Sequence, residues 1–226
     1  QLLQLDDMPL LPNHLKVTDI PKMENAEVAD LMARFEPLVK HFNRYLTIGG
    51  FPELALSDDD LYAQRMLRED VVDKVIKRDV LTLFKVRSPL LMEKLFLYLC
   101  MNSTEIFSAT TAAKELDNIS PNTIESYVDA LVKSNLIYMA YPIVVGSKSV
   151  LKGRPKIYIA DAAIRNAVLM VDDVLSNERE LGLLIETTVY KHLVSFYQGT
   201  GAQLGYYRKA KENQKEVDAV IELPQQ

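Results

Sequence analysis

Residues 107–116 read Phe-Ser-Ala-Thr-Thr-Ala-Ala-Lys-Glu-Leu, and residues 120–133 read Ser-Pro-Asn-Thr-Ile-Glu-Ser-Tyr-Val-Asp-Ala-Leu-Val-Lys. The first stretch predicts a short helix with Ser108 as its N-cap, and Ser120 before Pro121 is typical of a helix start. Two strand-like runs follow at 137–141 and 156–160, and a polar loop with glycines separates them. Together with an apolar helix at 89–101, this order predicts a winged helix-turn-helix.

Upstream of this module the pattern is helical. Apolar residues recur at three- and four-residue spacings from about Ala26, and Pro37 should kink or split that helix. Gly49-Gly50-Phe51-Pro52 interrupts the pattern, and a second long helix is predicted over 59–84. Residues 1–24 contain three prolines and little periodicity, which favours an extended connector.

Downstream, the sequence predicts a helix over 181–197 and two closing strands at 204–208 and 216–222. The expected fold class is therefore mostly α with a small β part. We divide the chain into a connector and helical segment (1–87), a winged helix (88–160) and a partial α/β piece (161–226).

Composition limits the classes of function. The chain has 226 residues, a formal net charge of −5 and a pI near 5.3, which argues against bulk attraction to nucleic acid or an anionic membrane. No apolar run is long enough for a membrane span and no signal peptide is recognisable, so the cytoplasm is the expected compartment. Cys100, the only cysteine, lies in an apolar run and is expected to be buried. Because the chain starts at Gln1 and stops just after a strand-like run, we expect a fragment of a longer protein.

Candidate nucleic-acid contacts lie in the loop of the predicted wing. The helix predicted over 120–133 carries Glu125 and Asp129 with only one cation, Lys133, and such a helix is a poor surface for phosphates. The wing instead gathers four basic side chains that could lie along a phosphate backbone, although an exposed hairpin tip without a ligand has the same pattern. These are Lys148, Lys152, Arg154 and Lys156.

Acidic residues near the C-terminus form a second candidate site. Glu186 lies in the predicted helix, and Glu216 and Asp218 point to the same side of the last strand. A helix carboxylate and a strand carboxylate can share Mg²⁺, but a nuclease of this kind also needs a Glu-x-Lys on a following strand, which is absent. We therefore expect Glu186 and Asp218 to lie close together without holding a metal, and strand-end acids without function remain the alternative.

Neither a phosphate-binding loop nor a metal-binding histidine pattern is present. The sequence has no Gly-x-x-x-x-Gly-Lys-Ser/Thr and no Gly-x-Gly-x-x-Gly, so this chain is not expected to hold ATP. The three histidines, His14, His41 and His192, lack metal-ligand spacing. No metal or cofactor is expected in this chain.

Several short motifs together resemble the region that follows the ATPase core in a large group of prokaryotic AAA-type ATPases. The resemblance runs from about residue 30 to the end, and Ala163 stands where that family usually has glycine. The motifs are Tyr45-Leu46-x-x-Gly49-Gly50-Phe51-Pro52-Glu53, Lys77-Arg78-Asp79-Val80, Ser120-x-x-Thr123-x-x-x-Tyr127-x-x-x-Leu131, Asp161-Ala162-Ala163-Ile164-Arg165-Asn166-Ala167, Gly182-x-x-x-Glu186 and Glu216-Val217-Asp218.

The resemblance implies a fold and a context. The C-terminal piece would be a truncated domain of unknown function with a restriction-endonuclease-like α/β fold, and ATP and Mg²⁺ would bind to the parent protein outside this chain. The first functional hypothesis is a non-catalytic accessory region that contacts a protein partner or nucleic acid. The alternatives are a truncated metal-dependent nuclease and, disfavoured by the acidic helix, a free-standing transcription regulator.

Overall fold

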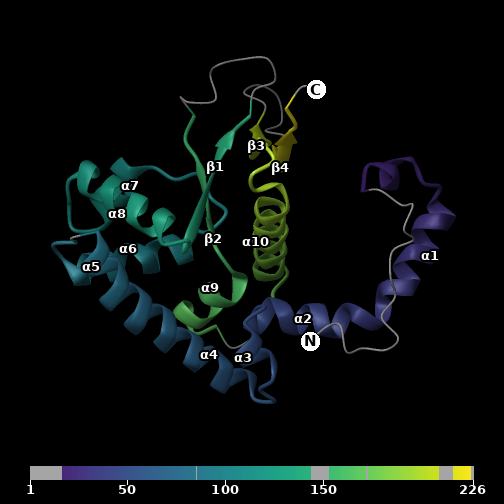
Figure 1. Ribbon diagram of the computed structural model, residues 1–226, viewed down its shortest axis with the longest axis horizontal. Helices are drawn as coiled ribbons and strands as arrows, with labels where there is room; N and C mark the ends of the chain where they lie inside the picture. Colours follow the sequence, from purple (N-terminus) through teal and green to yellow (C-terminus); the bar gives the residue numbers. More distant parts are fainter. Residues whose placement is uncertain (1–16, 85, 144–152, 172, 209–215, 225–226) are drawn as a thin grey trace.

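The computed structural model describes residues 17–84, 86–143, 153–171, 173–208 and 216–224. It is mostly helical with one four-stranded mixed sheet (Figure 1), as the sequence predicted. The helices are η2 (Val17–Lys22), α1 (Asn25–Phe35), η3 (Glu36–Leu38), α2 (Val39–Ile48), α3 (Pro52–Ala55), α4 (Asp60–Arg68), η4 (Glu69–Val80), α5 (Leu81–Leu83), α6 (Pro89–Met101), α7 (Ala109–Glu115), α8 (Pro121–Lys133), α9 (Ala162–Leu169) and α10 (Glu178–Tyr197). The strands are β1 (Ile137–Pro142), β2 (Lys156–Ile159), β3 (Gln203–Arg208) and β4 (Glu216–Glu222).

The N-terminal helices follow the predicted break at proline. Pro37 lies in the single 3₁₀ turn η3, which separates α1 from α2, because proline lacks the N–H that an α-helix interior needs. α1 projects away from the body of the protein and buries none of its residues (Figure 1). The extended connector predicted before it is partly wrong: residues 17–22 form the 3₁₀ helix η2, whose backbone angles the fixed φ of Pro21 permits. Residues 1–16 lie outside the described residues.

The second predicted long helix is continuous but changes its winding. α4 begins at the N-cap Asp59, whose side chain accepts a hydrogen bond from Tyr62 N at 2.9 Å. η4 has π-helical geometry, and the buried positions step from Val71 to Ile76, the five-residue spacing of a π-helix turn. These side chains pack into the main hydrophobic core.

The helices of the predicted winged helix form as expected. Ser108 caps α7 by accepting from Thr111 N, and Pro121 takes the first position of α8, although Ser120 makes no side-chain cap hydrogen bond. The inward face of α8 includes Ile124, Tyr127, Val128 and Leu131, which are buried, and Val132, which is half-buried. Cys100 is fully buried in α6, and burial raises the pKa of its thiol. The thiol is therefore protonated and unreactive at neutral pH.

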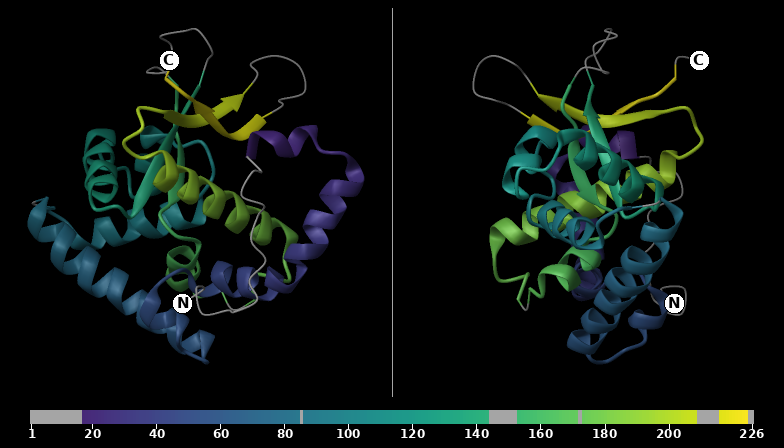
Figure 2. Two further views of the ribbon diagram at one scale, coloured as in Figure 1. Left: turned by 45° about the vertical axis from the view of Figure 1, so that its right-hand side comes forward. Right: turned by 90° about the vertical axis from the view of Figure 1, so that its left-hand side faces the viewer.

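One sheet joins the winged helix to the C-terminal part. The strand order is β2-β1-β3-β4: β1 and β2 are antiparallel, β1 and β3 parallel, and β3 and β4 antiparallel. The sheet therefore contains strands from both sides of position 160, where the sequence suggested a domain boundary. α10 packs beside the sheet (Figure 2), and the ring of its Tyr190 stacks on Tyr158 of β2 with the centroids 4.1 Å apart.

No helix of the described residues is both long enough and apolar enough to cross a membrane.

Candidate functional site

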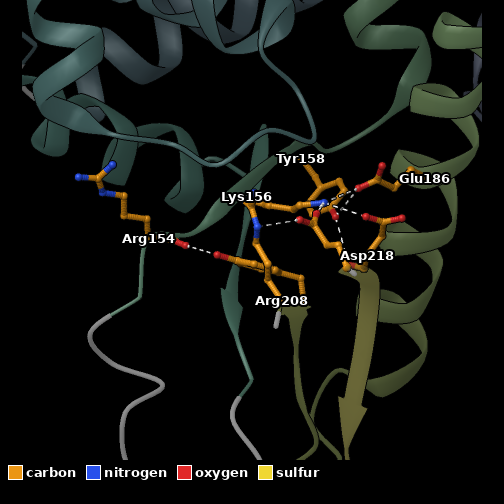
Figure 3. Close-up of polar contacts among 8 residues, drawn as sticks. Arg154, Lys156, Tyr158, Glu186, Arg208 and Asp218 are labelled. Atoms are coloured by element: carbon orange, nitrogen blue, oxygen red, sulfur yellow. Dashed lines mark hydrogen bonds and ion pairs between the residues drawn. The ribbon is translucent and has the colours of Figure 1, made fainter. Parts of the chain in front are cut away.

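The C-terminal acids surround a single lysine. The ammonium of Lys156 lies 2.8 Å from Asp218 Oδ1 and 3.3 Å from Glu186 Oε1, and it forms a third ion pair with Glu216 (Figure 3). The prediction that Glu186 and Asp218 lie close together is confirmed. We call these four side chains the Lys156 cluster.

The local geometry of three elements builds the Lys156 cluster. Lys156 and Tyr158 alternate along β2 and therefore point to the same face. Glu216 and Asp218 share a face of β4 for the same reason, and Glu186 comes from α10. The Tyr158 hydroxyl donates to Glu186 Oε1 at 2.7 Å and to the Asp218 carbonyl at 3.3 Å, so it links the helix and the strand.

Burial and charge fix the protonation of the lysine. The Lys156 side chain is only 5% exposed. Burial lowers its pKa, but the hydrogen bonds to Asp218 and Glu216 and the charge of Glu186 outweigh this, so the pKa lies above its ordinary value. Burial raises the pKa of Glu186, against the opposing effects of Tyr158 and Lys156. Lys156 is thus a permanent cation at neutral pH and cannot act as a general base.

Of the four predicted wing residues, the structure describes Arg154 and Lys156, and these two do not lie on one exposed surface. Lys148 and Lys152 lie outside the described residues. Arg154 is exposed, and its guanidinium points away from the Lys156 cluster (Figure 3). The expectation that Lys156 belongs to the exposed loop is wrong, because this residue is buried at the start of β2. Its acidic partners lie 30 to 62 residues further along the chain, so no local pattern reveals them.

A second polar junction gathers motifs that the resemblance singled out. Asp161 caps α9 by accepting from Ala163 N at 2.9 Å, and it forms an ion pair with Lys191 of α10. Asn166 Nδ2 donates to the carbonyl of Leu46 at 2.9 Å, which attaches α9 to α2. Gly49 fits against this junction so closely that an added Cβ would lie 2.8 Å from Asp161 Oδ1.

Arg165 extends the same junction. Its Nε donates to the carbonyl of Cys100 in α6 at 3.0 Å, and its Nη1 pairs with Glu180 of α10 at 2.6 Å. The arginine is 3% exposed. The polar residues at 161–167 therefore hold helices together, a role that the sequence analysis missed. The only local signal is the Asp161 N-cap before Ala162-Ala163.

The described residues contain no group of three or more His, Cys, Asp or Glu that could hold a metal ion. In the Lys156 cluster the ammonium pairs with all three carboxylates, and Arg208 Nε lies 3.7 Å from Glu216 Oε2, so the acids keep a net negative charge but their oxygens already have cationic partners. Of the histidines, His192 contacts the hydroxyl of Tyr45, with its Nε2 3.2 Å away. The arrangement of the Lys156 cluster suits cross-linking of strands and helix, and it presents no free nucleophile.

Residues 39–175 match a protein family described as a domain of unknown function (DUF8612). The chain is 25% identical over 190 residues to the uncharacterized protein MJ1544 of Methanocaldococcus jannaschii, an alignment that covers 81% of this chain and 40% of that protein. It is 30% identical over 175 residues to MJ1637 of the same organism, with 76% and 36% covered. Identity to the uncharacterized protein Rv2008c of Mycobacterium tuberculosis is 28% over 180 residues, with 77% and 39% covered. The chain thus spans about two fifths of the length of these relatives, and no solved structure matches it.

Proposed function

The chain belongs to the family of the domain of unknown function DUF8612, and from that premise we propose that it is a non-catalytic accessory region of a longer protein. In this role it contacts a protein partner or nucleic acid and holds the winged helix rigidly against the C-terminal hairpin. The observation that carries the proposal is the Lys156 ammonium at the centre of Glu186, Glu216 and Asp218.

The lysine argues for a structural use of the acids. A metal-dependent nuclease needs carboxylates whose oxygens are free to bind Mg²⁺, an ion that gives up its waters reluctantly. In the Lys156 cluster a residue of the winged helix forms ion pairs with acids of α10 and β4. Such an ion-pair network fixes the relative position of three elements, and a metal ion would have to compete with the ammonium for the carboxylate oxygens.

The longer protein is, in this proposal, an AAA-type ATPase. Support comes from the ordered motifs of the sequence and from the greater length of the relatives. ATP and Mg²⁺ would bind to the ATPase core and not to this region. The complete gene sequence tests this part: a Gly-x-x-x-x-Gly-Lys-Ser/Thr loop upstream is expected. A complete gene without one would remove the ATPase from the proposal.

We expect no DNA cleavage by this chain. Supercoiled plasmid incubated with the protein and either Mg²⁺ or Mn²⁺ should remain intact, because the carboxylates that would bind the metal are held by Lys156. The matched control is Asp218→Asn, which removes a candidate ligand. Metal-dependent nicking by the unmodified chain that is lost in Asp218→Asn would contradict the accessory proposal.

The second candidate, a truncated nuclease, has one observation in its favour. Glu186 and Asp218 meet beside a lysine amine, the set of groups that metal-dependent nucleases use. Here, however, the lysine comes from β2 of the winged helix and contacts both acids directly. Metal-dependent cleavage in the experiment above would favour this second candidate.

Nucleic-acid contact through the wing gives a separate prediction. Replacing Lys148, Lys152 and Arg154 with glutamate should abolish any binding to duplex DNA, and the salt dependence should correspond to a few phosphates, at about 0.9 in log–log slope for each. Lys156 is left unchanged because it is buried. Fluorescence anisotropy with labelled duplex measures both quantities.

The control for the wing is Lys94→Glu with Lys114→Glu. Both lysines are exposed on the same module, and they lie outside the loop. This variant should bind as the unmodified chain does. Equal binding by the loop variant and the unmodified chain would place the contact elsewhere.

A further inference from the structure

A groove of about 1280 Å³ separates the winged helix from the C-terminal part. The N-terminal end of α7, one face of α8 and β1 line one side, and the end of α10 and the start of β3 line the other. Pockets for small ligands usually occupy about 300–1,000 Å³. The volume of this groove exceeds that range and therefore favours a larger ligand, such as a segment of a polymer.

One wall of the groove is an open strand edge. Ala160 N donates to the carbonyl of Leu136 at 2.9 Å, which fixes the hydrogen-bonded pairs of the antiparallel β1–β2 ladder. Since these pairs alternate, the backbone groups of Ile137 and Met139 point away from β2. Ile157 confirms the alternation, because its N–H points out of the ladder on the far side and donates to Glu105 at 3.3 Å.

β3 covers only the far end of this edge. It pairs with β1 at Tyr141 and Pro142, and Ile143 N donates to the carbonyl of Tyr206 at 2.7 Å. At that point the strands are so close that a Cβ on Gly205 would lie 1.9 Å from the Tyr141 carbonyl oxygen. Closer to the start of β1, the described residues provide no hydrogen-bond partner for the backbone of Ile137 or Met139.

Unpaired backbone groups in a groove favour a ligand that can pair with them. Ile137 is fully buried and a ligand cannot reach its backbone, whereas Met139 is half-buried, so its outward N–H and C=O are the groups that a ligand in the groove could bind. An extended polypeptide offers N–H and C=O groups at the spacing of a strand edge, whereas a nucleic acid does not.

The charges of the groove also distinguish the polymers. The α8 side of the groove carries Glu125 and Asp129, which would repel phosphates and attract a basic side chain, while Arg154 lines the groove just before β2. Asp129 has one cationic neighbour, Lys133, at 2.6 Å on the exposed face of the helix. Glu125 has no ion-pair partner among the described residues, so a ligand cation would meet a free carboxylate there.

We propose that this groove binds an extended segment of a partner protein, which pairs with the open edge of β1 at Met139 and directs a basic side chain to Glu125 and Asp129. The inference deepens the accessory function proposed above by naming the kind of partner. Backbone pairing would supply the affinity, and the two acids would supply the preference for a cationic sequence.

The test uses two synthetic peptides, acetyl-Val-Lys-Val-Thr-Val-Lys-Val-amide and its twin with glutamate in place of lysine. The lysine peptide should bind the complete chain with a Kd below about 1 mM. Its binding should also slow hydrogen exchange of the Met139 amide, measured by NMR. The glutamate peptide should bind at least tenfold more weakly. No binding, equal binding of both peptides, or protection elsewhere would overturn the proposal.

Charge reversal supplies the matched variants. Glu125→Lys with Asp129→Lys should weaken binding of the lysine peptide at least tenfold, whereas Asp58→Lys with Glu115→Lys makes the same charge change at exposed sites outside the groove and should leave it unaltered. An oligothymidylate that displaces the peptide would show a nucleic-acid site and sink the proposal. DNA cleavage is measured independently, so failure of the accessory function and failure of this docking site remain distinguishable.

Discussion

Replacing Lys156 with methionine should lower the free energy of unfolding by about 3 kcal/mol, because it removes the cation that three carboxylates share and leaves only Arg208, 3.7 Å from Glu216, beside them. Methionine keeps much of the length of the side chain, so the change removes mainly the charge. This expected loss is at the lower end of the range for breaking a buried ion pair, because the Asp218 side chain is 54% exposed. Urea unfolding followed by circular dichroism at neutral pH measures it.

The matched control is Lys133→Met, which breaks an exposed pair with Asp129 on α8. That variant should lose less than about 1 kcal/mol. Removing the acids as well, by Glu216→Gln and Asp218→Asn, should restore part of the stability of Lys156→Met. Equal losses in the two single variants would show that the Lys156 cluster contributes no more than a surface ion pair.

The pKa of Lys156 sets the pH at which this difference is seen. Because the folded-state pKa lies above the ordinary value of 10.5, the contribution of Lys156 is complete below that value. It should disappear only as the pH rises through the folded-state pKa. Neutral pH is therefore well within the range where the variant shows its full loss.

Replacing Gly49 with alanine should destabilise the protein by about 3 kcal/mol, from backbone strain and close contact together. Gly49 has φ 75° and ψ −170°, a conformation that is essentially restricted to glycine. An added Cβ would also lie 2.9 Å from the Cβ of Ala163 and 2.8 Å from Asp161 Oδ1. Thermal and urea unfolding give the loss.

Gly182→Ala is the matched control for this change. Gly182 lies within α10, where an added Cβ meets nothing within 4 Å, and alanine favours a helix over glycine by up to about 1 kcal/mol. The Gly182 variant should therefore be as stable as the unmodified protein or more so. A Gly49 variant that keeps the stability of the unmodified protein would contradict the inference that α2 and α9 pack tightly at Gly49.

Local sequence determined the elements, because their signals involve neighbouring residues. Ser108 and Pro121 marked helix starts, Pro37 marked the break between α1 and α2, and strand-like runs near the C-terminus marked β3 and β4. Each signal depends on backbone geometry within a few residues. The proximity of Glu186 and Asp218 also followed, since only one long amphipathic helix was available to cover the last hairpin.

Only the tertiary structure decided what the charged residues do. Lys156 follows Pro155 in a loop-like stretch, and nothing nearby indicates that it is buried among acids from α10 and β4. Arg165 similarly finds Cys100 and Glu180 on other helices. The parallel pairing of β1 with β3, which ends beside the groove, joins residues more than 60 positions apart. Ion pairs and strand pairing are set by distances in space, and the local periodicity of a sequence carries no information about such distances.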